Sequence, residues 1–125
     1  MKRANEICPT TAKGKAENGA LFVDVRSRTE LDQVTFDVPH CLEIPLQELE
    51  ERWREIPKDR DIVLVCLSGE RSLRATYYLM NAGYQQVYNM REGLLKWVAN
   101  GFPVKGDVAS LASQASCDCS KPNCC

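Results

Sequence analysis

The chain has 125 residues and a nearly balanced charge, with 16 lysines and arginines against 17 aspartates and glutamates. A content of 44% hydrophobic and 26% charged residues is typical of one globular domain and excludes a disordered or fibrous chain. The lack of a basic excess argues against nucleic acid as a partner. No apolar run approaches the roughly 18 residues of a membrane span, and no apolar segment follows the basic start, so we expect no membrane partner and a cytoplasmic location.

Apolar runs predict strands, and helical spacing of apolar residues predicts helices between them. In chain order the strands are expected at residues 6–7, 21–25, 42–44, 61–65 and 85–89. The helices are expected at 10–18 (weakened by Gly14), 29–34, 46–56, 72–83 and 91–101. This alternation predicts an α/β fold with a mostly parallel sheet and helices on both faces. The pattern stops after residue 106, so we divide the chain into a domain, 1–106, and a flexible Cys-rich tail, 107–125.

Seven cysteines are many for this length, and they are unevenly placed. Cys8, Cys41 and Cys66 are scattered through the globular part, whereas the other four crowd the last nine residues. An odd total in this distribution does not fit a secreted disulfide framework. We therefore expect a reducing compartment in which at least one thiol works as a thiol.

The segment DIVLVCLSGERSLRATYYL places Cys66 at the end of a predicted strand, just before a loop and a helix. Ligands of parallel α/β sheets bind at this end of the strands, where loop N–H groups and the positive helix end form an anion cradle that favours a thiolate. Gly69 permits the tight turn, and Arg71 supplies a fixed charge and a planar set of donors. A buried, inert Cys66 is the alternative, because cysteines are often core residues. The combination of strand, cysteine, glycine, arginine and helix favours a functional thiol.

The loop CLSGERS resembles the C-x-x-G-x-R-S active-site loop of rhodanese-like single-domain sulfurtransferases, and the similarity covers about residues 5–105. LFVDVRSRTEL and LEIPLQEL resemble two further segments of that family. MREGLLKWVANGFPV resembles the closing segment, with Glu92 where the family usually has its first glycine. The resemblance implies a rhodanese fold, with a five-stranded, largely parallel sheet between helices.

The resemblance also implies an enzyme of sulfur metabolism, a sulfurtransferase whose catalytic cysteine, Cys66, carries a persulfide. A sulfane sulfur would pass from thiosulfate or a persulfide or polysulfide donor to a thiol, protein or cyanide acceptor in a double displacement. The persulfide cradle is expected to consist of Leu67, Ser68, Gly69, Glu70, Arg71 and Ser72. This chemistry needs no cofactor and no metal, and we expect a monomer.

Three features near the loop receive structural interpretations. We expect Asp24 and Arg26 to form an ion pair or a loop brace rather than to take part in catalysis. His40, the single histidine, is expected to be an exposed loop residue. The segment 36–41, FDVPHC, departs from the family pattern. Because this loop borders the active-site entrance in the family, the departure bears on substrate preference.

Two alternatives remain open. A phosphatase or arsenate reductase on the same fold has five residues between the cysteine and the arginine, whereas four lie between Cys66 and Arg71 here, which suits a single sulfur better. A non-enzymatic thiol or metal-handling module would use the tail, since four thiolates suit Zn²⁺ or Cu(I). The same tail thiols would alternatively accept sulfur from Cys66, or form a solvated tail without a role. These candidate ligands are Cys117, Cys119, Cys124 and Cys125.

Overall fold

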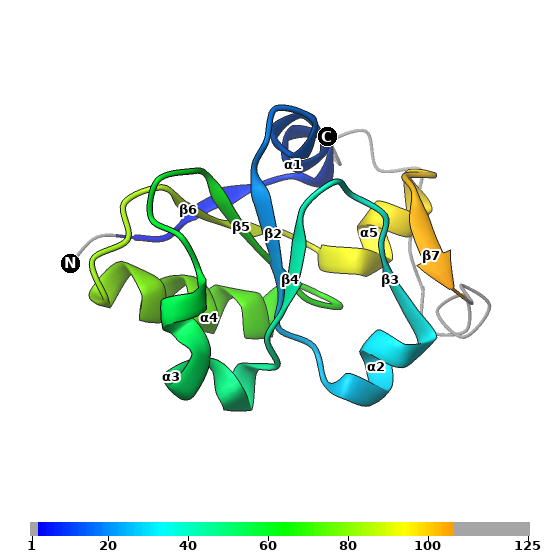
Figure 1. Ribbon diagram of the computed structural model, residues 1–125. Coiled ribbons are helices and arrows are strands. Elements are labelled where there is room, and N and C mark those ends of the chain that lie inside the picture. Colours follow the sequence, from blue (N-terminus) through cyan, green and yellow to red (C-terminus); the bar gives the residue numbers. More distant parts are fainter. Residues whose placement is uncertain (1–2, 107–125) are drawn as a thin grey trace.

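The computed structural model describes residues 3–106, which form a central sheet with helices on both faces (Figure 1). The strands are β1 (Asn5–Ile7), β2 (Leu21–Asp24), β3 (Val34–Phe36), β4 (Cys41–Glu43), β5 (Ile62–Val65), β6 (Val87–Met90) and β7 (Val104–Gly106). The α-helices are α1 (Pro9–Glu17), α2 (Arg28–Gln33), α3 (Leu49–Arg52), α4 (Glu70–Asn81) and α5 (Gly93–Ala99), and the 3-10 turns η1 (Leu46–Glu48) and η2 (Trp53–Glu55) flank α3. Within residues 3–106, no helix has the length and hydropathy that crossing a membrane requires.

The main sheet has five strands in the order β1-β6-β5-β2-β4, and every neighbouring pair is parallel. Asp24 lies opposite Val65, so the two central strands, β2 and β5, end at the same level. All five strands present their carboxyl ends at one edge of the sheet, which is where parallel sheets bind ligands. The predicted α/β fold with a five-stranded, largely parallel sheet is confirmed.

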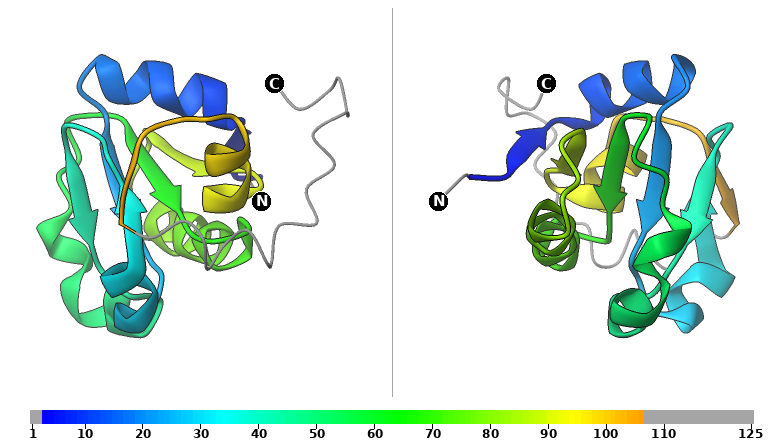
Figure 2. Two further views of the ribbon diagram at one scale, coloured as in Figure 1. Left: turned by 90° about the vertical axis from the view of Figure 1, so that its right-hand side faces the viewer. Right: turned by 60° about the vertical axis from the view of Figure 1, so that its left-hand side comes forward.

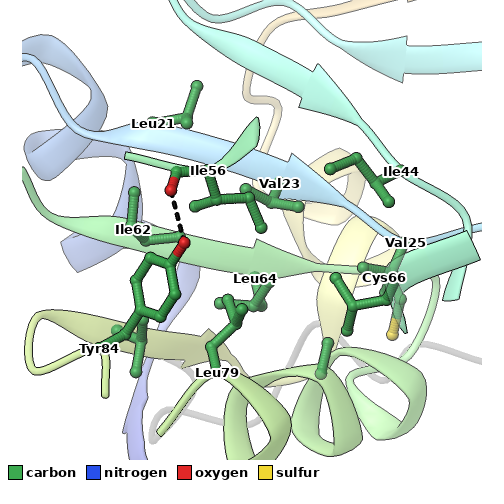
Figure 3. Packing of buried hydrophobic residues seen from close by; sticks show 13 residues of the cluster. Leu21, Val23, Val25, Ile44, Ile56, Ile62, Leu64, Cys66, Leu79 and Tyr84 are labelled. Carbon is green, nitrogen blue, oxygen red and sulfur yellow. Dashed lines mark hydrogen bonds between the residues drawn. The ribbon is translucent and has the colours of Figure 1, made fainter. Parts of the chain in front are cut away.

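Side chains of the central strands alternate between two cores, because successive residues of a strand point to opposite faces. On one face, Val23 and Leu64 pack with Leu79 of α4 (Figure 3). On the other face, Phe22 packs with residues of α1 and α5. Its ring meets that of Trp97 edge to face, with 5.6 Å between the ring centroids. Figures 1 and 2 show the resulting layers, with α4 on one side of the sheet and α1 and α5 on the other. Burial on both faces explains why β2 and β5 are almost continuously apolar.

The predicted helix over residues 46–56 is wrong as a single element. The segment forms η1, α3 and η2 in succession, although Leu49 and Ile56 are buried as their spacing predicts. The segment is bounded by Pro45 and Pro57, and Ile56 is extended, with φ −85° and ψ 121°. A residue before proline avoids helical conformations, so the helix is confined to a short run and tightens at both ends.

Two other expectations for helices need adjustment. α1 is a regular nine-residue helix from Pro9, where we expected a weak one interrupted by Gly14. Proline suits the first helical position, and Ala12 and Ala16 pack against the sheet, which outweighs the glycine. The helix expected to include Val34 ends at Gln33, because Val34 begins β3.

A second, two-stranded sheet was not expected from the sequence. β3 and β7 pair antiparallel, with Val34 opposite Gly106 and Phe36 opposite Val104. Each strand has three residues, too few for a recognisable alternation. The pairing places residues 104–106, the last ones that the structure describes, beside the strand that follows α2.

The segment 36–41 does not border the loop that follows Cys66, contrary to our expectation. The N–H of Phe22 donates to the carbonyl of His40, and Cys41 lies opposite Phe22 near the start of β2. Cys66 follows the last residue of β5, so the two loops lie at opposite edges of the sheet, and Figure 1 shows the β3–β4 turn beside the start of β2. His40 is exposed, as predicted.

Candidate active site

Cys66 directly follows β5 at the carboxyl edge of the sheet, and Gly69 begins the turn into α4. The side chain of Cys66 is almost completely buried, at 1% exposure, and lies beside Val25 (Figure 3). Gly69 has a φ of 99°, a left-handed conformation that glycine adopts without strain. The backbone therefore curls around the sulfur within four residues.

Three polar groups surround the Cys66 sulfur. The N–H of Gly69 donates to Sγ at 3.0 Å, and the N–H of Ser72 donates to it at 3.4 Å. The Ser72 Oγ lies 3.3 Å from the same sulfur. Backbone N–H groups of a loop and of the first turn of a helix thus converge on one atom, which is an arrangement that stabilises an anion.

Helix α5 holds the loop from behind. The N–H groups of Leu94 and Leu95 donate to the carbonyls of Cys66 and Leu67, at 2.8 and 3.1 Å. Gly93 makes this approach feasible, because a Cβ at that position would lie 2.4 Å from the Cys66 carbonyl oxygen. These bonds fix the start of the loop, and the N–H groups that meet the sulfur come from Gly69 and Ser72 further along it.

Asn89 of β6 reaches the loop from the neighbouring strand. Its Oδ1 accepts a hydrogen bond from the Ser72 hydroxyl, and its Nδ2 donates to the Gly69 carbonyl at 3.2 Å. Sequence analysis missed Asn89. The available signal was a polar residue within the strand VYNM, where a buried side chain must find hydrogen-bonding partners.

Arg71 points toward α2 and forms a two-pronged ion pair with Glu30. The distances are 2.6 Å from Nη1 to Oε1 and 2.9 Å from Nη2 to Oε2. Glu30 also accepts from the backbone N–H and hydroxyl of Ser27, which caps α2. The Arg71 guanidinium beside Glu30 lowers the pKa of that carboxyl to about 2. The charge that we expected to serve an incoming anion is therefore already matched by a carboxylate.

Asp24 and Arg26 form a buried ion pair at the end of β2, which agrees with the structural interpretation. Arg26 Nη2 lies 2.8 Å from Asp24 Oδ2 and donates to the Val34 carbonyl at 2.7 Å. Burial raises the pKa of the Asp24 carboxyl, and the hydrogen bonds from Arg26 oppose that shift. The pair joins the end of β2 to β3, and within residues 3–106 the hydrogen bonds to the Cys66 sulfur come from Gly69 and Ser72 instead.

A hollow of about 310 Å³ opens beside Arg71 at the carboxyl edge of the sheet. It is lined by residues of the β2–α2 connection, of the segment after β4 and of α4, namely Val25, Ser27, Pro45, Leu46, Gln47 and Arg71. Val25 belongs to the same hydrophobic cluster as Cys66. The hollow therefore shares Val25 with the cluster around Cys66, and its walls are both apolar and polar.

The other predicted site residues lie as follows. Leu67 is half-buried, and Ser68 and Glu70 are exposed at the rim of the loop. Burial raises the pKa of the Cys41 thiol to about 12, which makes Cys41 a poor nucleophile. Among residues 3–106, no three His, Cys, Asp or Glu side chains gather as a metal site would require. The tail candidates lie outside the described residues: Cys117, Cys119, Cys124 and Cys125.

The fold and the loop define an α/β protein that presents a cysteine sulfur to two backbone N–H donors at the carboxyl edge of its sheet. The family model of the rhodanese-like domain matches residues 9–100. A sulfurtransferase of Allochromatium vinosum is 43% identical over 84 residues, which cover 67% of this chain and 77% of that protein. Thiosulfate sulfurtransferase 18 of Arabidopsis thaliana is 34% identical over 105 residues, covering 74% of this chain and 77% of that protein.

Among solved structures, a rhodanese-related protein of Thermoplasma volcanium superposes with a TM-score of 0.74 at 24% identity, covering 82% of this chain and 99% of that one. This likeness supports the fold. The family model over residues 9–100 and the relative that is 43% identical show that the chain belongs to the rhodanese-like family and is a rhodanese-type sulfurtransferase.

Proposed function

We propose that this protein moves a sulfane sulfur from a persulfide or polysulfide donor to a thiol acceptor through a persulfide on Cys66. The observation that carries the proposal is the convergence of the Gly69 and Ser72 N–H groups on Cys66 Sγ. In the first step the Cys66 thiolate attacks the outer sulfur of the donor, and the donor's thiolate leaves. In the second step the acceptor thiolate attacks the outer sulfur of the Cys66 persulfide, and the electron pair of the broken S–S bond returns to Sγ.

The small ring of the loop supports sulfur rather than phosphate as the transferred group. Four residues separate Cys66 from Arg71, and the N–H of Gly69 lies within 3.0 Å of Sγ. The phosphatases that share this fold have a longer loop around a tetrahedral anion. A single outer sulfur needs less space, and the N–H groups that meet Sγ also favour the negative charge of a persulfide.

The charges around the loop favour a donor of low charge. Arg71 is the one cation in the segment 66–72, and Glu30 neutralises it. Glu70 adds an exposed negative charge at the rim. Thiosulfate is a dianion and gains little attraction from this arrangement. The persulfide group of an alkyl persulfide carries at most one negative charge, so we expect thiosulfate to be the weaker donor.

The hollow beside Arg71 is the approach that we assign to the acceptor. Its volume of about 310 Å³ is at the small end of ligand pockets, which fits a low-molecular-weight thiol or one cysteine side chain of a protein. Val25, Pro45 and Leu46 give it an apolar wall for the body of such a thiol.

The experiment that tests the function is mass spectrometry of the full chain after incubation with glutathione persulfide, and separately with thiosulfate. We expect one added sulfur on the peptide that contains Cys66, and its removal by cyanide as thiocyanate. Cys66→Ser should lose this sulfur and keep its fold, whereas the control Cys41→Ser should load normally.

The proposal is contradicted if Cys66→Ser still takes up one sulfur that cyanide removes. It is also contradicted if the wild type hydrolyses an aryl phosphate and does not load sulfur. Faster loading from thiosulfate than from glutathione persulfide contradicts the donor preference alone. A tail relay is tested by truncation after Gly106: equal loading and unloading rates in the truncated and full chains exclude it.

A further inference from the structure

Asn89 stands out because it is a buried polar side chain that contacts the loop from another strand. It is 2% exposed, and Ser72 is fully buried. The two partners of Asn89 are Ser72 and Gly69, the same two residues whose N–H groups meet the Cys66 sulfur. The Asn89 side chain is therefore hydrogen-bonded to both residues that donate an N–H to the sulfur.

The Ser72 hydroxyl has one proton and two neighbours that accept it. In the structure this proton goes to Asn89 Oδ1, and Ser72 Oγ lies 3.3 Å from Cys66 Sγ. In this state the hydroxyl oxygen offers a lone pair toward the sulfur, which suits a protonated thiol. When Sγ becomes an anion, a rotation about the Cβ–Oγ bond of Ser72 turns the O–H toward it. Asn89 stays in place during this rotation because its Nδ2 remains bound to the Gly69 carbonyl.

We propose that Asn89 is a positioning residue for sulfur transfer: it holds the Gly69 peptide where its N–H stabilises the Cys66 thiolate that leaves in the second step, and it keeps Ser72 Oγ beside the sulfur until the O–H turns to that charge. This inference rests on the proposed persulfide route. In that step the S–S bond breaks, the acceptor keeps the outer sulfur, and the electron pair develops as charge on Sγ. The Ser72 O–H is then a third donor to that charge, beside the N–H groups of Gly69 and Ser72.

The two half-reactions should respond differently to the loss of this positioning. Unloading creates the thiolate, so a less stable thiolate slows it directly. Loading consumes the thiolate, and a less stable thiolate is less abundant but more nucleophilic, so that the two effects partly cancel. A loop that has merely loosened would slow both half-reactions.

The test is a double-mutant cycle of Asn89→Leu and Ser72→Ala in the full chain. Cys66 is first loaded with glutathione persulfide, and the rate of unloading by excess cyanide is followed by mass spectrometry of the Cys66 peptide. Loss of one hydrogen bond to a developing charge predicts that each single variant unloads roughly tenfold more slowly. Because Asn89 acts through the Gly69 peptide as well as through Ser72, the double variant should be slower than Ser72→Ala, but by less than the slowing that Asn89→Leu causes on its own.

The matched control is Thr76→Val. Thr76 is fully buried in α4 and its hydroxyl donates to the Ser72 carbonyl at 2.8 Å, so this variant removes a hydrogen bond to the same residue without touching the sulfur. We expect its unloading rate to equal that of the wild type. If Asn89→Leu does not fold, as judged by near-ultraviolet circular dichroism, Asn89→Ser replaces it in the cycle, since its short neutral side chain fits the same place.

Additive losses in the cycle, equal slowing of loading and unloading, or an Asn89 variant that behaves like Thr76→Val would each overturn the inference. These outcomes are distinct from failure of the proposed function, in which the wild-type chain itself would not load sulfur on Cys66. A wild type that loads and unloads normally, with an additive cycle, leaves the function standing and removes the role of Asn89.

Discussion

Glu30 and Arg71 lie 41 positions apart in the sequence and share two hydrogen bonds, of 2.6 and 2.9 Å. The pair joins α2 to the first turn of α4, and so connects the segment after β2 to the loop that surrounds Cys66. Glu30 also closes the capping box of α2 with Ser27. One carboxylate thus stabilises a helix start and orients the arginine of the active-site loop.

The ion pair predicts a loss of stability in acid. The pKa of Glu30 falls from its ordinary value of 4.5 to about 2 in the folded protein, chiefly through the hydrogen bonds from Arg71. Because the folded state holds this carboxyl in its ionised form, the contribution to stability is complete above about pH 5 and is lost as the pH falls toward 2. We expect the free energy of unfolding, measured with urea, to fall more steeply over this range in the wild type than in Glu30→Gln.

The comparison with Glu30→Gln isolates one carboxyl. Asp24 has the opposite sign, since burial raises its pKa in the folded state; the charge of Glu30 is the smallest cause of that rise, so most of the Asp24 contribution is common to both proteins. Parallel curves for wild type and Glu30→Gln between pH 5 and pH 2 would contradict the prediction.

Two substitutions of Arg71 distinguish the effect of its positive charge from the effect of its planar guanidinium group. Lysine keeps the charge but offers a single point of contact to Glu30, and alanine leaves the half-buried carboxylate without its partner. We expect Arg71→Ala to lose more activity than Arg71→Lys, and to be less stable than Arg71→Lys by about 0.5–1 kcal/mol. Steady-state sulfur transfer and urea unfolding measure the two effects. Wild-type rates for both variants would mean that the backbone N–H groups alone hold the sulfur anion.

Glu92 is a place where the backbone stores strain. Within residues 3–106 it is the one residue other than glycine with a positive φ, at 62°. A side chain in this left-handed region costs free energy, so Glu92→Gly should raise the free energy of unfolding by about 0.5–1 kcal/mol. Glu92→Ala keeps the strain and serves as the control, with no comparable gain expected. Equal stabilities of the glycine and alanine variants would argue against strain at this position.

Gly93 should tolerate no side chain. A Cβ there would meet the carbonyl oxygens of Cys66 and Leu67 at 2.4 and 2.5 Å, which are backbone atoms that cannot yield without moving the loop. We expect Gly93→Ala to destabilise the fold by more than about 2 kcal/mol and to abolish sulfur loading on Cys66. Gly14→Ala is the control: a Cβ at Gly14 meets nothing within 4 Å inside α1, so this variant should gain about 0.5–1 kcal/mol. Thermal unfolding and the mass of the Cys66 peptide report both outcomes.

The sequence alone was enough to predict the main sheet and the position of the sulfur. β2 and β5 are short, mainly apolar runs that follow turn signals, a pattern that indicates strands buried on both faces. The order of strand, Cys66, Gly69 and helix then predicts the loop, because chain connectivity places these residues within a few ångströms of one another. At the start of α2, Ser27 and Glu30 form a capping box, a local signal that our expectation of a helix from residue 29 did not use.

Tertiary structure decided what depends on residues distant in the chain. The sequence did not indicate that Asn89 lies against Gly69 and Ser72, since that contact follows from the pairing of β6 beside β5. Nor did it place the segment 36–41 at the opposite edge of the sheet, because that position follows from the register of β4 on β2. The antiparallel pair of β3 and β7 has the same origin: three residues are too few to show a period, and these segments are strands because they pair with each other across the chain.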